Sequence, residues 1–343
     1  MAKKTLRPVT IAGLGSYAPE RVVTNQELID KYNIATSDKW IREKLGIVER
    51  RYAAPDEQTS DLAVKASLKA MEMAGVTPDD IGGIILALGY GDVRSPSTAC
   101  RVQEKLGAFN SWAMDANTAC MGFIWACEVG SKFVADGSCD AFLAIGADLA
   151  SRTKFDPHDR TLGILFGDGA GAAVLKPCRE GEGFLSFFTL SDGRGFDAIG
   201  ARAGGSVMPL TPEALEQGHH LLHQDGRTVW KYAMRGMTQS IREAVKRAGL
   251  TIDQVDFLVT HQANMRLIES IMNEVGIPGT KSYTTVQKYG NTSSGTVGTA
   301  LDEAYRAGKF KPGDKVVLAG IGAGFTWSGA VINWTLPPPK QAR

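Results

Sequence analysis

An internal repeat constrains the fold of this chain more than any other feature of its sequence. The segment MAGVTPDDIGGIILA, residues 73–87, matches RAGLTIDQVDFLVTH, residues 247–261, at an offset of 174 positions. Each segment combines the end of an amphipathic helix, a glycine at which the helix stops, a Thr-x-Asp turn and a short apolar strand. The match therefore relates two helix–turn–strand units of the same kind.

Two further matches occur at the same offset. Asn117-Thr118 falls on Asn291-Thr292. The apolar segment DAFLAIG, residues 140–146, falls on DKVVLAG, residues 314–320. Each copy therefore runs through a helix, a strand, an Asn-Thr turn, a second helix and a second strand.

We predict that the chain consists of two α/β halves, residues 1–175 and residues 183–335, joined near the polar stretch KPCREGEG. A chain of 343 residues is long enough for one large domain or two medium ones. Because helices alternate with short strands rich in Val, Ile and Leu, we expect mostly parallel sheets that are covered on both faces.

Charge and composition exclude several classes of partner. The formal net charge is +1 and charged residues make up 22% of the chain, so no overall field attracts nucleic acid or a membrane surface. No apolar run approaches the roughly 18 residues that a membrane span needs. The N-terminus has no apolar stretch of signal-peptide length. We therefore expect a cytoplasmic protein that binds neither nucleic acid nor membrane.

The cysteines and histidines do not form a metal-binding pattern. The five cysteines are odd in number and include no Cys-x-x-Cys pair, which argues against a disulfide framework or a zinc site. His219 and His223 stand four residues apart, a spacing that would place both on one helix face. No third ligand accompanies them. We predict no metal and no bound cofactor.

Three polar residues fall where an α/β protein usually places its site. Cys120 follows the first Asn-Thr pair by three residues, at the expected start of a helix. Asn291 belongs to the second Asn-Thr pair, and His261 ends the apolar strand of the second copy. Because strand ends and helix starts meet at one edge of such sheets, we expect the three side chains to lie together. A free cysteine is more often a buried filler, so this arrangement is what favours a nucleophile.

Four longer motifs identify a family resemblance. They are HQANMRLI (261–268), YGNTSSGTVGTALDEA (289–304), GIGAGFTWSGAV (320–331) and FGDGAGAAVL (166–175). Together they resemble the signatures of β-ketoacyl-ACP synthase III, the condensing-enzyme branch of the thiolase superfamily. The likeness extends from about residue 8 to residue 335. It implies a duplicated thiolase-like α/β fold with αβαβα layers and two pseudo-symmetric halves, and a homodimer.

The resemblance also implies the roles of the three clustered residues. The nucleophilic cysteine of the family corresponds to Cys120, its histidine to His261 and its asparagine to Asn291. The backbone N–H groups of Cys120 and Ala323 correspond to its oxyanion hole. The family often has glycine at the position of Ala323.

The proposed chemistry explains these residue types. A polarisable sulfur suits acyl transfer from a thioester, and a helix N-terminus favours its thiolate form. The small neighbours Ala119 and Gly122 would let the thioester approach. Loss of CO2 from a malonyl thioester then needs neutral hydrogen-bond donors for the developing enolate, and a neutral histidine and an asparagine supply them.

The resemblance implies further contacts with substrates. The coenzyme A contacts correspond to Trp40, Lys44 and Arg160, although an arginine is usual at the position of Lys44. Ser95 stands where acetyl-specific relatives commonly have a phenylalanine that closes the partner subunit's acyl tunnel, so we expect a roomier acyl pocket. Arg266 is either a solvated charge or part of a docking surface for acyl carrier protein. The segment HHLLHQDGRTVWKYA, residues 219–233, is expected to border the substrate channel.

We therefore predict decarboxylative condensation of an acyl group, carried on Cys120 and derived from acyl-CoA, with a malonyl thioester on ACP or CoA. The product is a 3-oxoacyl thioester, made in fatty-acid initiation or in a specialised fatty-acid or polyketide pathway. The alternative is an acyltransferase that moves the acyl group through Cys120 to another acceptor without decarboxylation.

Other enzymes that use related residues fit less well. A thiolase needs a second cysteine near its C-terminal glycine loop, and none follows Cys178. Plant-type polyketide synthases carry a Gly-Phe-Gly-Pro-Gly loop that is absent here. Hydroxymethylglutaryl-CoA synthases and olefin-pathway condensing enzymes use a glutamate in the loop that has Ser95 here, and ester-forming relatives replace the asparagine by aspartate. A papain-like hydrolase would carry its cysteine near the mature N-terminus.

Overall fold

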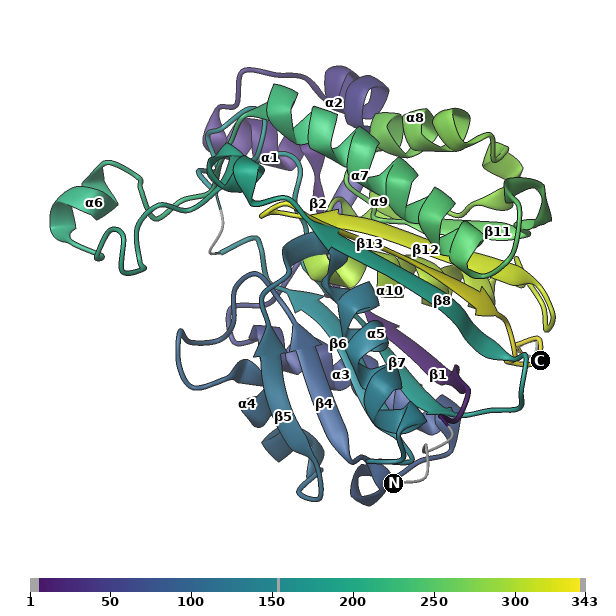
Figure 1. Cartoon of the computed structure of the whole chain (residues 1–343). Helices are drawn as coiled ribbons and strands as arrows, with labels where there is room; N and C mark the ends of the chain where they lie inside the picture. The colour runs from purple at the N-terminus through teal and green to yellow at the C-terminus, as the bar shows by residue number, and fades with distance from the viewer. Residues whose placement is uncertain (1–5, 153–154, 340–343) are drawn as a thin grey trace.

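The computed structural model describes residues 6–152 and 155–339. Its strands form two large mixed sheets that lie face to face (Figure 1). The first sheet has the order β1 (Val9–Tyr17), β7 (Gly169–Pro177), β6 (Phe142–Asp148), β4 (Gly83–Ala87) and β5 (Trp112–Ala116). The second has the order β11 (Phe257–Thr260), β12 (Lys315–Gly322), β13 (Thr326–Asn333) and β8 (Gly183–Ser191). All strands of the first sheet precede residue 178 and all strands of the second follow residue 182.

The helices complete five layers. The helices α5 (Gly122–Ala135) and α10 (Thr296–Arg306) lie between the two sheets (Figure 1). The outer face of the first sheet is covered by α3 (Thr59–Ala74) and α4 (Thr98–Leu106), and that of the second by α7 (Gly226–Arg247) and α8 (Met265–Val275). Because β4 and β6 are covered on both faces, every one of their residues is buried, which explains their continuous apolar sequences.

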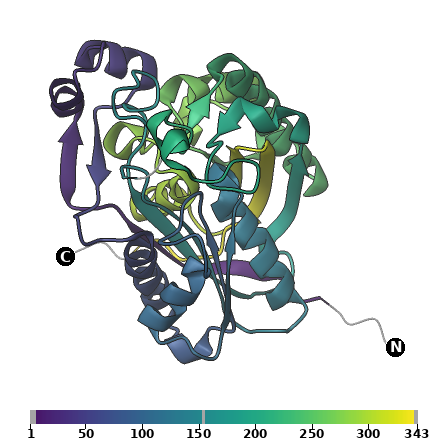
Figure 2. The ribbon, with the colours of Figure 1, turned by 90° about the vertical axis from the view of Figure 1, so that its left-hand side faces the viewer.

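The remaining elements are short and lie outside the two large sheets. The helices are α1 (Asn25–Tyr32), α2 (Asp38–Leu45), α6 (Pro212–Glu216) and α9 (Val286–Tyr289), and the strand pairs are β2 (Arg21–Thr24) with β3 (Glu49–Tyr52) and β9 (Ile199–Gly200) with β10 (His223–Gln224). The 3-10 turns are η1 (Pro78–Asp80), η2 (Ala119–Met121), η3 (Gly193–Ala198), η4 (Ile252–Gln254), η5 (Gly279–Lys281) and η6 (Ser293–Gly295). Figure 2 shows the purple α1–α2 segment beside the green helices of the second half, and α2 packs on α8.

The duplicated thiolase-like fold is confirmed by the strand orders. The sequence β1-β7-β6-β4-β5 in one sheet corresponds to β8-β13-β12-β11 in the other, and Leu258 of β11 makes one parallel bridge with Ser282 where a fifth strand would lie. The turns η1 and η4 lie at the offset found in the sequence, as do η2 and η6. The two predicted stop glycines, Gly75 and Gly249, have φ angles of 62° and 71°, in the region that glycine adopts most readily.

The prediction of mostly parallel sheets is wrong. The pairs β4–β5, β4–β6 and β11–β12 are parallel, whereas β1–β7, β6–β7, β12–β13 and β13–β8 are antiparallel. Residues 323–325 alone connect β12 to β13, and so short a connection joins only antiparallel neighbours. The alternation of helix and strand describes only the inner part of each half.

The structure also bears on the expectations about membrane spans and about the histidine pair. Among residues 6–152 and 155–339, no helix is both long and apolar enough to cross a membrane. The cytoplasmic location and the absence of cofactors stay predictions. His219 and His223 do not share a helix face, because His219 lies in the turn after α6 and His223 lies in β10.

Candidate active site

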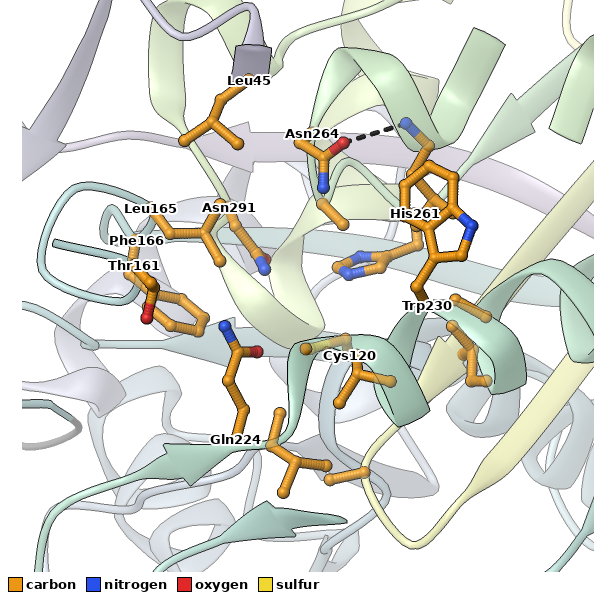
Figure 3. A pocket seen from close by; sticks show the side chains of 18 of the residues that line it. Leu45, Cys120, Thr161, Leu165, Phe166, Gln224, Trp230, His261, Asn264 and Asn291 are labelled. Atoms are coloured by element: carbon orange, nitrogen blue, oxygen red, sulfur yellow. Dashed lines mark hydrogen bonds between the residues drawn. The ribbon is translucent and has the colours of Figure 1, made fainter. Parts of the chain in front are cut away.

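One cavity of about 260 Å³ brings residues of both halves together. Six of the residues singled out in the sequence line it, namely Cys120, His261, Asn291, Ala323, Trp40 and Arg160. Figure 3 shows the side chains of Cys120, His261 and Asn291 directed toward one common space. Most of the remaining wall is apolar, with Leu165, Phe166 and Trp230 among its side chains. The cavity can therefore hold a largely apolar substrate next to three reactive or polar groups.

Cys120 is the middle residue of η2, two residues before α5 begins at Gly122. The turn packs closely against the end of β12: a Cβ atom on Gly322 would lie 2.2 Å from the carbonyl oxygen of Thr118 and 3.1 Å from the amide nitrogen of Cys120. Only glycine fits there, because real Cβ atoms do not approach the backbone so closely. Gly322 is therefore part of the site, and its only sequence signal is its place beside Ala323 in the glycine-rich motif.

The expectation for Gly122 is wrong. Gly122 is buried, and a Cβ atom there would lie 2.5 Å from Cβ of Ala87. Its small size therefore lets α5 pack against β4, and does not open a path to Cys120. The other small neighbour, Ala119, is only partly buried and has a φ angle of 47°.

His261 directly follows β11 and is 3% exposed. Its backbone N–H donates to the carbonyl of Ala319 at 2.8 Å, which continues the pairing of β11 with β12. Its Nδ1 atom forms a 2.7 Å hydrogen bond with Oγ1 of Thr296 at the start of α10. The Thr296 contact fixes the orientation of the imidazole, so that its other edge faces the cavity.

Asn291 lies between α9 and η6. Its N–H donates to the carbonyl of Leu165 at 2.9 Å, and its own carbonyl accepts from the N–H of Gly167 at 3.1 Å. Its side-chain Oδ1 accepts the backbone N–H of Ser293 at 2.8 Å. Because the amide oxygen is occupied, the group that Asn291 can offer to a substrate is its NH2 donor.

The other cysteines lie in different surroundings. Burial raises the pKa of Cys127, and it raises the pKa of Cys139 and of Cys178 to about 11. These three thiols stay protonated near neutral pH, and Cys127 is a core residue. Cys100 is exposed on α4, outside the cavity, where its thiol contacts the carbonyl of Ala113 at 3.7 Å.

The mouth of the cavity carries an aromatic–cation pair. The guanidinium carbon of Arg160 lies 5.8 Å from the ring centroid of Trp40, and both residues line the cavity. Lys44 is exposed on α2 and does not line it, although its neighbour Leu45 does. The structure therefore brings two of the three expected coenzyme A contacts together.

The last two residues singled out in the sequence lie outside the cavity. Arg266 is exposed at the start of α8, and its guanidinium carbon lies 5.2 Å from the ring centroid of Trp230, which lines the cavity. Ser95 is exposed in the loop between β4 and α4. In the single chain, Ser95 is not part of the cavity wall.

Sequence reasoning did not single out two polar side chains of the cavity. Gln224 of β10 and Asn264 line it, and Figure 3 shows both side chains. Oδ1 of Asn264 accepts the N–H of Leu267 at 2.9 Å as the N-cap of α8, so the motif that contains His261 also starts a helix. Gln224 directly precedes Asp225, the N-cap of α7. The segment 219–233 was expected to border the channel, and Gln224 and Trp230 within it do.

Comparison with known proteins places these features in one family. The family model of 3-oxoacyl-[acyl-carrier-protein] synthase III matches residues 114–193, and the model of its C-terminal part matches residues 245–334. The β-ketoacyl-[acyl-carrier-protein] synthase III of Clostridioides difficile is 44% identical over 330 residues, which cover 95% of this chain and 98% of the relative.

Two solved structures are similar over almost their whole length. The 3-oxoacyl-[acyl-carrier-protein] synthase III of Aquifex aeolicus has a TM-score of 0.87 at 34% identity, with 95% of this chain and 100% of that chain covered. The priming β-ketosynthase from the R1128 polyketide pathway has a TM-score of 0.89 at 32% identity, with 99% of both chains covered.

Proposed function

This chain belongs to the 3-oxoacyl-[acyl-carrier-protein] synthase III family, and on this premise we propose that it condenses an acyl group with a malonyl thioester on acyl carrier protein. The acyl group comes from an acyl-CoA and is held on Cys120. One observation carries the proposal: a cysteine before a helix, a buried histidine and an asparagine whose amide oxygen is already occupied line a single cavity.

In the first step, the sulfur of Cys120 attacks the carbonyl carbon of the acyl-CoA. The carbon–sulfur bond to CoA breaks, and CoA leaves as a thiol after taking up one proton. The helix N-terminus of α5 favours the thiolate. The backbone N–H groups of Cys120 and Ala323 are the proposed donors to the tetrahedral oxyanion, which is supported by their shared place at the cavity wall.

In the second step, the malonyl thioester loses CO2 and becomes an enolate. His261 and the NH2 group of Asn291 donate hydrogen bonds to the thioester oxygen as its charge grows. The enolate carbon then attacks the acyl-cysteine, which releases the sulfur of Cys120 and gives the 3-oxoacyl thioester. Neither donor carries a negative charge, so neither opposes the developing anion.

The rim residues are proposed to bind the carrier groups. Trp40 and Arg160 form a ready site for the adenine and phosphates of CoA, since an indole stacks on a base and a guanidinium pairs with phosphate. Lys44 contributes only charge from its exposed position. Arg266 is the proposed contact for acidic acyl carrier protein near the same opening.

We also propose that the protein is a homodimer and that Ser95 lines the partner subunit's acyl tunnel. The edge strand β5 supports this, because none of its residues is buried in the single chain whereas every residue of its neighbour β4 is. Sedimentation velocity is the direct test. A Met114→Lys variant is expected to sediment as a monomer, since Met114 is 51% exposed on that edge.

The test of the reaction uses an acyl-CoA together with malonyl-ACP labelled in its free carboxyl carbon. We expect one labelled CO2 released for each 3-oxoacyl-ACP formed, and neither product from Cys120→Ala. Transfer of the acyl group through Cys120 to another acceptor, without release of labelled CO2, would instead establish the acyltransferase alternative.

A further inference from the structure

Ser293, two residues after Asn291, contacts the nucleophile Cys120. The hydroxyl oxygen of Ser293 lies 3.6 Å from Sγ of Cys120, within hydrogen-bond distance for sulfur. Ser293 is 2% exposed, so little water reaches this contact. The two residues come from the 3-10 turns of different halves, η2 and η6.

We propose that Ser293 is a positioning residue that holds Cys120 as a thiolate by donating its hydroxyl hydrogen to the sulfur. A thiolate has no hydrogen, so in the charged state the hydroxyl must be the donor. A hydrogen bond to the charged form favours that form, and it is stronger where water is excluded. The inference rests on Cys120 being the nucleophile proposed above.

The backbone of Ser293 is fixed by contacts that do not involve its hydroxyl. Its N–H donates to Oδ1 of Asn291 at 2.8 Å, and its carbonyl accepts the backbone N–H of Thr296. The same residue therefore orients Asn291 through its main chain and reaches Cys120 through its side chain. Removing the hydroxyl should separate the two roles.

The other half shows that the turn itself does not need this hydroxyl. Ser293 has a φ angle of 54°, which is unusual for a residue other than glycine. At the repeat offset of 174 positions it corresponds to Ala119, whose φ angle is 47°. Because an alanine adopts this conformation in η2, we expect Ser293→Ala to fold and to lose only the contact with sulfur.

The neighbouring serine is a matched control. Ser294 lies in the same turn and is fully buried, but its hydroxyl bonds to Oδ2 of Asp148 at 2.8 Å and to the carbonyl of Ala147 at 3.1 Å. Ser294→Ala therefore removes a buried hydroxyl from η6 that does not point at Cys120. Its effect should fall on folding stability.

The test is the pH dependence of alkylation by iodoacetamide in a Cys100→Ser background, which removes the exposed thiol. We expect Ser293→Ala to raise the apparent pKa of Cys120 alkylation by about one unit, so that the rate below that pKa falls about tenfold. The alkylation rates with Ser293 and with alanine at this position should converge at high pH, where Cys120 is a thiolate in both proteins. Ser293→Gly, which also tolerates the turn, should shift the profile equally.

Two results would overturn the inference: an unchanged alkylation profile in both Ser293 variants, or an equal shift in Ser294→Ala. Neither outcome touches the proposed function, because alkylation needs no acyl or malonyl substrate. Conversely, a Cys120→Ala variant that still forms 3-oxoacyl-ACP would overturn the function and not this contact.

Discussion

The two 3-10 turns η2 and η6 have similar backbone conformations, but only η2 carries the proposed nucleophile. Residues 119 and 293 both have left-handed φ angles, and each turn leads directly into the helix between the sheets. At the repeat offset, Cys120 corresponds to Ser294. Cys120 lines the cavity, whereas Ser294 is fully buried and bonded to Asp148.

The strand that meets each turn explains the difference. Asp148 ends β6 and accepts hydrogen bonds from Ser294, while the corresponding residue of β12 is Gly322, beside Cys120. Asp148 is fully buried and also accepts the N–H of Gly89. The turn η6 is therefore held by hydrogen bonds to a buried carboxylate, whereas η2 packs against a glycine that offers its residues no such bond. The duplication supplies the geometry and a few side chains decide which copy reacts.

The largest expected effect lies at Cys120. Cys120→Ala should lower both acyl loading and condensation at least about a thousandfold, because no other thiol lines the cavity among residues 6–152 and 155–339. Cys100→Ser is the control, since Cys100 is exposed on α4 and should leave both rates unchanged. Acyl label found on a tryptic peptide other than the one with Cys120 would break the comparison.

Gly322 is the next position. A Cβ atom there would collide with the Thr118 carbonyl at 2.2 Å, so Gly322→Ala should displace the Cys120 turn and slow acyl loading about a hundredfold. Gly279→Ala is a matched control, since nothing lies within 4 Å of the added atom. Loading rates measured by quenched-flow mass spectrometry would contradict the account if both variants behaved alike.

A substitution in η6 should lower the stability of the fold and leave the loading rate nearly unchanged. Ser294→Ala leaves the buried Asp148 without one donor, which should lower the free energy of unfolding by about 1–3 kcal/mol. Urea denaturation measures this loss. A loading rate reduced as much as in Gly322→Ala would mean that the two turns are not divided in this way.

The smallest expected effect concerns the loops that follow β4 and β11. The second loop begins with His261 at the cavity, whereas the first holds the exposed Ser95. If Ser95 lines the partner's tunnel, each buried methylene adds about 0.8 kcal/mol, or several-fold in rate, for longer acyl groups. Ser95→Phe should shift the preference among acetyl-, butyryl-, hexanoyl- and octanoyl-CoA toward acetyl. An unchanged chain-length profile would remove Ser95 from the acyl pocket.

The sequence predicted the repeat and the three clustered residues because both rest on local patterns. The stop glycines, the Asn-Thr turns and the strand before His261 each act within a few residues of chain. The residues that were missed act between the halves: Gly322 makes room for the Cys120 turn, and Ser293 reaches across to the sulfur. No local pattern reveals a contact between segments more than a hundred residues apart.

The two wrong expectations, at Gly122 and in the direction of the strands, have separate causes. Gly122 looked like an opening for substrate because its partner Ala87 lies on a strand far away in sequence. The sheets were predicted to be parallel because the short connection between β12 and β13 was not recognised as a tight turn. It lies inside the motif GIGAGFTWSGAV, which was interpreted as a glycine-rich site.

The most direct test of this account separates loading by the first half from decarboxylation supported by the second, in the variant Asn291→Ala. The protein is exposed to acyl-CoA and then to labelled malonyl-ACP, while intact-protein mass spectrometry follows the acyl adduct and released CO2 is counted. We predict an acyl adduct formed within a few-fold of the wild-type rate, and CO2 release reduced about a hundredfold or more. Equal losses of adduct formation and CO2 release would contradict the division of labour between the two halves.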